Sequence, residues 1–183
     1  MFSKTITCYK LFKVRKGELY PLFVKFKDGQ PFQVGEWEMA LSGEKNPITG
    51  KVKSSLGDLA YRPGFHAGDV PVALHIGGKS RKGLKKPDYR KKNQVWCEVE
   101  VPAIVDWQSI ANKNGTNKSG KIVAKNAAIT DCVPYAGYYK FKTNSNMYGS
   151  WIISGNMKIL RVLTDKEVFE INSKTGVHDL PRK

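Results

Sequence analysis

The chain has 183 residues, with 31 Lys plus Arg against 16 Asp plus Glu and a formal net charge of +15. Hydrophobic residues make up 40% of the sequence and aromatic residues 11%, which is enough for one ordinary core and argues against disorder of the whole chain. The charge favours an anionic partner, because a positive field concentrates phosphate-bearing ligands, but it does not identify that partner.

The first half of the chain is predicted to form strands joined by turns. Apolar and β-branched runs between turn residues predict strands over residues 7–14, 19–27 and 31–39. The first two runs flank Lys16-Gly17, so we expect a hairpin there, with Pro21 restricting the second strand to an edge or a bulge. Residues 42–57 are rich in Gly, Ser and Lys and predict a long loop, whereas residues 70–76 predict a short helix that begins after Asp69.

The second half contains the clearest strand signal, which is residues 94–102 (QVWCEVEVP), where apolar and polar side chains alternate. Further strands are predicted over residues 138–142 and 151–163. Short helices are predicted over residues 106–113 and after Thr164, whose capping-box partner is Glu167. The pattern predicts a single α+β domain over residues 1–172, with a mainly antiparallel sheet, two or three short helices and a long basic loop, followed by a C-terminal tail over residues 173–183.

The basic loop is the strongest compositional feature. Residues 79–92 contain eight basic residues and one acidic residue, so this segment contributes +7 of the total charge. Gly83, Pro87 and the lack of apolar periodicity predict an exposed loop. We expect it to bind a nucleic acid, since so dense a run of charge exceeds what solubility requires. The basic residues are Lys79, Arg81, Lys82, Lys85, Lys86, Arg90, Lys91 and Lys92.

Aromatic and lysine residues are interleaved in several predicted strands, most clearly in YYKFK. In a strand, Lys140 and Lys142 share a face with Tyr138, so an aromatic ring and two ammonium groups would face the same way. Such a face suits single-stranded nucleic acid, because rings stack on bases while amines neutralise phosphates. The alternative is an ordinary amphipathic strand, with the aromatics in the core and the lysines in solvent.

Two histidines suggest a catalytic hypothesis. His66 and His75 lie nine residues apart on either side of a turn, and metal-independent RNA cleavage needs a general base, a general acid and a cation such as Lys79 or Arg81. The alternative is that His75 is a core histidine within the apolar stripe of a helix. No metal-binding His spacing occurs, so we expect neither a metal nor a cofactor.

Cysteines and carboxylates are expected to serve the fold. Cys8, Cys97 and Cys132 lack a Cys-x-x-Cys pair and predict buried, reduced thiols. Glu98 and Glu100 share one face of a strand, where they either bind a cation or divide acid and base roles, or face outward and attract lysines. Without an apolar run of membrane-spanning length or an apolar leader near the first residue, we expect a cytoplasmic protein with no membrane partner.

Three stretches, YRPGFHAGDVPVALHIGG, NQVWCEVEVP and GYYKFKTNSNM with WIISGNMKILRVLTDKEV, resemble an uncharacterised domain of bacteriophage and mobile-element proteins, some of them large polyvalent polypeptides. The likeness covers roughly residues 9–170 and implies a phage or mobile-element setting, hence the cytoplasm of a bacterial host.

A weaker resemblance is to ADP-ribosyltransferases. It rests on residues 10–15, 64–77 and 96–102 and implies NAD binding. Where that family has its catalytic Glu, before Trp151, the chain reads NMYGS, so Glu98 or Glu100 would have to substitute.

The function expected from the sequence is therefore nucleic-acid binding, to RNA or single-stranded DNA, through the basic loop and the lysine-aromatic strands, with RNA cleavage as a possible addition. Two alternatives stay open. One is an ADP-ribosyltransferase-like protein that binds NAD. The other is a non-enzymatic inhibitor or structural protein that binds an acidic protein surface, which would use the same positive charges.

Overall fold

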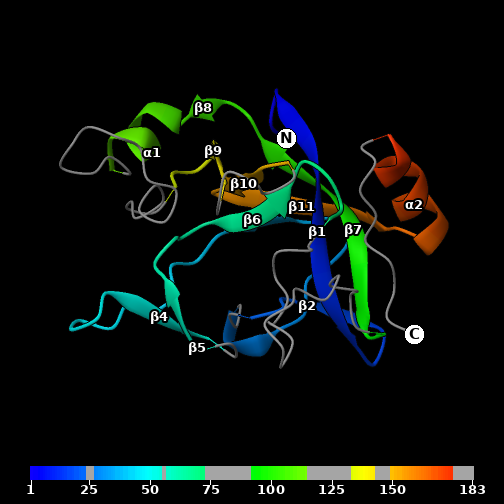
Figure 1. Cartoon of the computed structure of the whole chain (residues 1–183), viewed down its shortest axis with the longest axis horizontal. Coiled ribbons are helices and arrows are strands. Elements are labelled where there is room, and N and C mark those ends of the chain that lie inside the picture. The colour runs from blue at the N-terminus through cyan, green and yellow to red at the C-terminus, as the bar shows by residue number, and fades with distance from the viewer. Residues whose placement is uncertain (24–26, 55–56, 73–91, 115–132, 143–148, 175–183) are drawn as a thin grey trace, which may run out of the picture.

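The computed structural model describes residues 1–23, 27–54, 57–72, 92–114, 133–142 and 149–174. Within these ranges the chain forms one large sheet, a separate two-stranded ribbon of β4 (Lys51–Ser54) and β5 (Gly57–Ala60), and two α-helices (Figure 1). The sheet has the order β3-β11-β7-β1-β6-β10-β9-β8, and β2 also pairs with β1. Its strands are β1 (Thr5–Arg15), β2 (Glu18–Tyr20), β3 (Trp37–Met39), β6 (Phe65–Gly68), β7 (Gln94–Pro102), β8 (Val105–Asp106), β9 (Gly137–Phe141), β10 (Trp151–Ser154) and β11 (Asn156–Val162).

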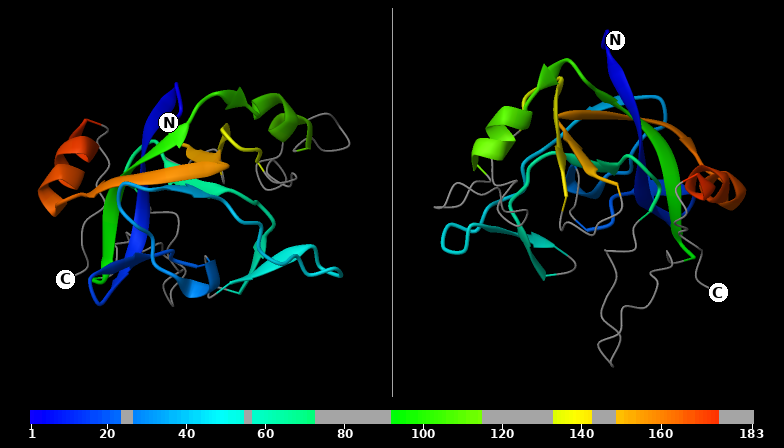
Figure 2. Two further views of the ribbon diagram at one scale, coloured as in Figure 1. Left: turned by 180° about the vertical axis from the view of Figure 1, so that it is seen from behind. Right: turned by 45° about the horizontal axis from the view of Figure 1, so that its top comes forward.

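β1 and β7 form the longest ladder of the sheet. They run antiparallel, with Thr5 opposite Pro102 at one end and Lys13 opposite Gln94 at the other. Every described pairing in the large sheet is antiparallel except β8 with β9 and the single bridge of Val34. Figures 1 and 2 show that the sheet curls strongly, since β1 and β7 run steeply in Figure 1 while β6 and β10 cross the picture.

The curled sheet encloses the main core, because alternate residues of each strand point to the same side. β1 contributes Cys8 and Phe12, β6 contributes Phe65, and β10 contributes Ile152. Other buried members are Leu19, Phe32, Ala67, Cys97, Val99, Val101, Met157 and Ile159. Burial raises the pKa of the Cys8 and Cys97 thiols to about 12, so both remain protonated at neutral pH, as the sequence predicts for structural thiols. Cys132 lies outside the described residues.

Both helices cover the face of the sheet that points away from the main core, at different strands. α1 (Gln108–Asn114) contributes Ala111 to a second cluster with Tyr139, Phe141 and Ile153, on the β9 and β10 face that points away from the main core. α2 (Asp165–Ser173) contributes Val168 to a third cluster, whose other buried members are Leu11, Trp96 and Leu163. The long strand β1 thus has an apolar environment on both faces.

The predicted start of α2 is confirmed. The Thr164 hydroxyl accepts a hydrogen bond from the Glu167 backbone N–H at 3.2 Å, and the Glu167 carboxylate accepts one from the Thr164 backbone N–H at 2.8 Å. This reciprocal pair satisfies two N–H groups that the helix start would otherwise leave without partners. The other helix begins two residues later than expected, because the Asp106 carboxylate accepts from the Gln108 backbone N–H at 2.8 Å and Asp106 itself belongs to β8.

Several predicted segments differ from the structure. The expected strand over residues 19–27 ends at Tyr20, and residues 27–29 form a short 3-10 helix. Of residues 31–39, only Trp37–Met39 form a strand, although Phe32 and Val34 each make one isolated bridge. The expected loop over residues 42–57 contains β4. Local composition does not capture these pairings, because each depends on a partner distant in sequence or on a hairpin without strong apolar alternation.

Two further expectations are corrected by local geometry. Residues 151–163 form two strands, not one, because the chain turns at Gly155, where a side chain would collide with the Pro134 backbone. Residues 70–72 are not helical, since the Val72 backbone N–H bonds back to the Val70 carbonyl at 2.9 Å. The rest of that predicted helix lies outside the described residues.

The described residues fit the expected α+β class, with a mainly antiparallel sheet and two α-helices. Most of the predicted basic loop, residues 79–91, lies outside them. The boundary between the domain and a C-terminal tail stays a prediction. In the part of the chain that the structure describes, no helix combines the length and apolarity needed to cross a bilayer.

Candidate nucleic-acid interface

The turn between β1 and β2 carries a group of cations. Lys16 and Gly17 both have positive φ, 50° and 83°, which matches the twist of a tight hairpin turn. The turn leaves Arg15 and Lys16 exposed. Lys13, two residues before Arg15 on β1, is half-buried. Glu18 faces Arg15 across the hairpin, and its carboxylate, which accepts from the Tyr20 hydroxyl at 2.8 Å, is one negative charge against the two cations Arg15 and Lys16. The hairpin tip is therefore net positive.

The basic segment joins the chain at this hairpin. The Val14 backbone N–H donates to the Asn93 carbonyl at 2.8 Å, and Lys13 is paired with Gln94. Lys92, which is exposed, is therefore next to the hairpin tip. We call Lys13, Arg15, Lys16 and Lys92 the basic end. The other predicted binding residues of the segment lie outside the described residues: Lys79, Arg81, Lys82, Lys85, Lys86, Arg90 and Lys91.

The predicted lysine-aromatic strand is β9. Lys140 and Lys142 are exposed, whereas Tyr138 is half-buried and packs against the main core. Both backbone groups of Lys140 are bonded to the Gln108 side chain, at 2.7 and 3.1 Å, so α1 is fastened along this strand. β9 lies several strands away from β1 in the sheet, so these two lysines form a group separate from the basic end.

His66 is on β6, opposite Ile153 of β10. Its Nδ1 lies 3.1 Å from the Gly64 carbonyl oxygen and its ring centroid 6.4 Å from that of Trp151. Burial, with smaller contributions from Lys10 and Arg62, lowers the His66 pKa to about 3. The imidazole is therefore neutral at physiological pH, and Nδ1 is the nitrogen that donates to the carbonyl. His75 lies outside the described residues, so its position relative to His66 is not part of this geometry.

Lys10 is a half-buried lysine with an internal hydrogen bond that the sequence analysis missed. Its Nζ donates to the His66 carbonyl oxygen at 2.7 Å and lies 5.8 Å from the Phe12 ring centroid. The ladder between β1 and β6 holds one residue pair, Tyr9 with Gly68, so His66 lies where the two strands have diverged. The Lys10 ammonium group therefore supplies the hydrogen bond that the His66 carbonyl does not receive from the β1 backbone. Burial lowers the Lys10 pKa to about 8. A sequence signal existed, because Lys10 alternates with Cys8 and Phe12 on the apolar face.

The paired carboxylates of β7 hold cations of β11. Glu98 bonds Arg161 at 2.7 Å, and Glu100 bonds Lys158 at 2.6 Å. Glu100 also accepts from the Thr5 hydroxyl at 3.0 Å, and the bond from Lys158 is the main cause that lowers its pKa. These contacts fit the alternative in which Glu98 and Glu100 face outward and attract basic side chains of the same protein. Among the described residues, no group of three His, Cys, Asp or Glu side chains is placed to hold a metal ion.

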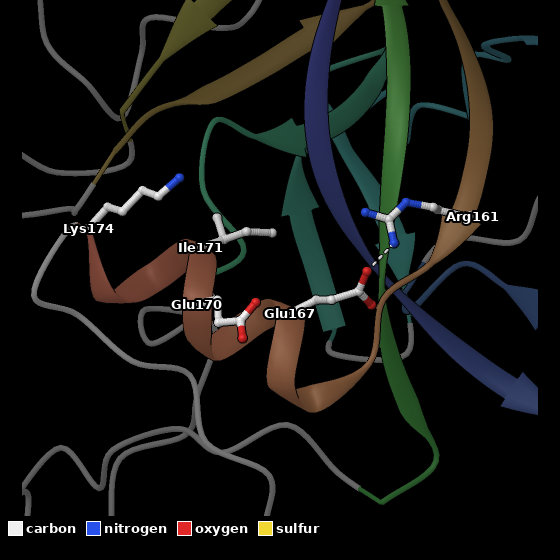
Figure 3. A pocket seen from close by; sticks show the side chains of 5 residues that line it. All are labelled: Arg161, Glu167, Glu170, Ile171 and Lys174. Carbon is white, nitrogen blue, oxygen red and sulfur yellow. Dashed lines mark hydrogen bonds and ion pairs between the residues drawn. The ribbon is translucent and has the colours of Figure 1, made fainter.

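One open pocket lies along α2 and the end of β11. Arg161, Glu167, Glu170, Ile171 and Lys174 line it (Figure 3). Figure 3 shows Glu167 reaching toward Arg161, with which it forms an ion pair, while Glu170 and Lys174 lie farther along the helix. The lining combines both signs of charge, and Arg161 and Glu167 already pair with each other.

Comparison with known proteins gives no relative from which a function can be transferred: no family model, no curated protein and no solved structure matches the chain.

Proposed function

We propose that the protein binds nucleic acid through the basic end and the basic segment that joins it at Lys92. The observation that carries this proposal is that two basic segments of the chain meet beside the β1–β2 hairpin. Residues 13–18 contain three cations and one anion, and residues 79–92 contain eight cations and one anion. The two segments therefore hold +9 of the +15, and the pairing of Val14 with Asn93 brings their described ends together. A polyanion fits such a concentration of one sign of charge.

The distribution of acidic side chains supports the same proposal. Glu38, Glu98 and Glu100 are each in an ion pair with a cation of the same chain. Glu167 and Glu170 are likewise paired, with Arg161 and Lys166. Because these acids offset cations elsewhere, they leave the positive charge of the basic end without compensation from this part of the molecule.

A charge-reversal experiment tests the proposal. The triple variant Lys13→Glu, Arg15→Glu, Lys16→Glu, which we call the hairpin variant, should bind a fluorescein-labelled 20-nucleotide DNA strand at least tenfold more weakly than the unaltered protein. Fluorescence anisotropy measures this affinity. If each residue contacts one phosphate, the slope of log K against log salt should also become shallower by about 2, at about 0.7 per contact with a single strand.

The matched control makes the same change of charge elsewhere. Lys51→Glu, Lys113→Glu and Lys174→Glu alter three exposed lysines on β4, α1 and the end of α2. This control should lose much less affinity than the hairpin variant. Equal losses would show a nonspecific effect of net charge, and binding by the unaltered protein that does not respond to salt would contradict the proposal.

A basic protein of this kind would act in phage or mobile-element biology, a setting supported by the sequence resemblance alone. The alternative partner, an acidic protein surface, uses the same cations, so polyglutamate should be included as a competitor. Competition by polyglutamate as strong as that by DNA of equal charge would favour the protein partner.

The catalytic hypotheses receive no added support from the described residues. The lowered pKa of His66 makes its imidazole a weak base, and Glu98 and Glu100 are both engaged by cations. The RNA-cleavage hypothesis is tested by His66→Ala with labelled RNA in EDTA, where cleavage that persists would remove His66 from the mechanism. The transferase hypothesis is tested by NAD turnover.

A further inference from the structure

Three aromatic side chains from distant parts of the sequence meet at the end of β1 opposite the hairpin. The ring centroid of Phe2 lies 4.5 Å from that of Trp37 and 5.1 Å from that of Tyr135. Phe2 meets Trp37 edge-on at 76° and is tilted by 43° to Tyr135. We call these three residues the aromatic platform. In Figure 1 the N-terminus, next to which Phe2 lies in the chain, and the hairpin between β1 and β2 lie at opposite ends of β1.

The aromatic platform is a surface feature and not part of the core. Tyr135 is 67% exposed, and Phe2 and Trp37 are half-buried. The neighbouring β8 adds Val105, which is 38% exposed and whose backbone N–H bonds the Ala136 carbonyl at 3.1 Å. Exposed aromatic rings that gather from three segments gain little from folding, because much of their surface remains in water. Such a patch is typical of a binding site.

One cation lies against a ring of the aromatic platform, and a second basic residue lies nearby in the chain. The Nζ of Lys158 lies 5.0 Å from the Trp37 ring centroid while it also pairs with Glu100. Lys4 is exposed and its carbonyl oxygen accepts from the Ala103 backbone N–H at 2.9 Å, which fixes its backbone beside the end of β7. Glu36, the acidic residue directly before Trp37, is exposed as well. Lys158 is compensated by Glu100, whereas the Glu36 carboxylate is exposed and can be altered in a test.

We propose that the aromatic platform stacks unpaired bases of single-stranded nucleic acid. This inference rests on the proposed function and specifies its ligand. Base faces are accessible in a single strand and hidden in a duplex, and each base that stacks on an aromatic side chain adds to the affinity. The net charge of +15 disfavours a basic partner, and the exposed rings favour a ligand that joins flat apolar faces to phosphates. Unpaired nucleotides combine both properties.

The length of β1 gives the ligand a minimum size. β1 has 11 residues, so the two ends of the strand are separated by roughly 33 Å at about 3.3 Å per residue. Stacked nucleotides advance by about 3.4 Å each, so a strand of about ten nucleotides would reach from the basic end to the aromatic platform. A 20-nucleotide strand is therefore long enough to engage both.

The test compares Tyr135→Ala with Phe169→Ala on two probes, fluorescein-labelled dT20 and a labelled 20-base-pair duplex. Phe169 is a matched control, because it is also an exposed aromatic, 51% accessible, but lies on α2. Tyr135→Ala should weaken binding of dT20 by at least fivefold and leave the duplex unaffected, whereas Phe169→Ala should change neither. Glu36→Gln, which removes the carboxylate beside Trp37, should strengthen dT20 binding by about twofold at low salt.

Unchanged dT20 binding by Tyr135→Ala, with duplex binding intact, would overturn the stacking proposal and leave the proposed function standing. An equal loss on both probes would also overturn it, since a duplex offers no free base faces. If the unaltered protein binds neither probe, the proposed function fails and the stacking proposal fails with it.

Discussion

Two groups of cations in this protein are placed for different purposes. Lys10, Lys158 and Arg161 each hold an acceptor of the same chain, which is the His66 carbonyl for Lys10 and a β7 carboxylate for the other two. Within the described part of the chain, Lys13, Arg15 and Lys16 have no acidic side chain within ion-pair distance. We call Lys10, Lys158 and Arg161 the internal cations.

The difference shows that net charge is a poor guide to a binding site until the compensated cations are set apart. The internal cations should affect the free energy of unfolding and its pH dependence. The cations of the basic end should affect ligand binding with little effect on stability. Substitutions in the two groups can therefore confirm or break the distinction.

The largest expected effect on stability comes from His66, which lies among internal positive charges. Its pKa is about 3 in the folded protein and near 6.5 when unfolded, so on acidification the unfolded chain takes up a proton that the folded protein excludes. Stability should therefore fall as pH decreases below about 6.5. Relative to His66→Asn, which keeps a donor for the Gly64 carbonyl, the protein should lose about 2.5 kcal/mol between pH 7 and 4.5.

Urea denaturation of the two proteins across that range measures this difference. The comparison with His66→Asn removes the shared contribution of the carboxylates, such as Glu167, whose pKa is held near 2 by its bonds to Thr164 and Arg161. Parallel stability curves for the two proteins would show that His66 titrates normally and is not enclosed by the fold.

Lys10 should show the opposite pH trend. Its pKa is about 8 when folded and near 10.5 when unfolded, so above about pH 8 the folded protein has released a proton that the unfolded chain retains. Stability should rise with pH through this window. Relative to Lys10→Met, the protein should gain about 2 kcal/mol between pH 7.5 and 9.5.

The reference variant is needed because Cys8 and Cys97 act in the other direction. Their raised pKa values make stability fall with pH above about 9, and both thiols are present in Lys10→Met as well. If the difference in free energy of unfolding between the unaltered protein and Lys10→Met does not change with pH, the Lys10 amine is hydrated. Lys10 would then belong with the exposed cations.

The sequence predicted those features that depend on local pattern. The alternation of residues 94–102, the Lys16-Gly17 hairpin and the Thr164 capping box all appear in the structure, because each is determined by residues a few positions apart. The break at Gly155 depends on close approach to Pro134, which no local pattern records.

The candidate site was predicted less completely for the same reason. The dense charge of residues 79–92 is visible in composition, but its junction with the hairpin follows from the pairing of β1 with β7. The aromatic platform brings together positions 2, 37 and 135, so no window of sequence contains it. Lys10 had a local signal, a cation at an apolar position of the strand, which was outweighed by the lysine-rich composition around it.

A smaller effect on stability is expected at Arg161, the internal cation with the most exposed position. It bonds Glu98 and Glu167, which links β7 to the first turn of α2, but half of its side chain is accessible. Arg161→Gln should lower the free energy of unfolding by less than either change above at low salt, and by still less at high salt, because solvent screens an exposed ion pair. Binding of dT20 should change far less than in the hairpin variant. A loss of binding as large as that of the hairpin variant would remove the distinction between the two groups.

The smallest effect on stability is expected at Lys16, where one substitution should raise stability and weaken binding. This opposition makes it the sharpest test of the difference between the internal cations and the basic end. Lys16 has φ of 50° and precedes Gly17 with φ of 83°, a turn in which Asn-Gly is strongly preferred and lysine is disfavoured. Lys16→Asn should therefore raise the free energy of unfolding by about 0.5 kcal/mol, as side chains that tolerate positive φ do. The same change removes one cation of the basic end and should weaken dT20 binding severalfold.

Lys16→Arg separates the two contributions, since it keeps the charge and gains nothing at positive φ. It should retain the binding and the stability of the unaltered protein. If Lys16→Asn is more stable and binds equally well, the charge at the turn has no role in binding, and the basic end is no different from any other exposed lysine surface. The expected result, higher stability with weaker binding, would mean that a lysine occupies this turn at the expense of the fold because its charge contacts the ligand.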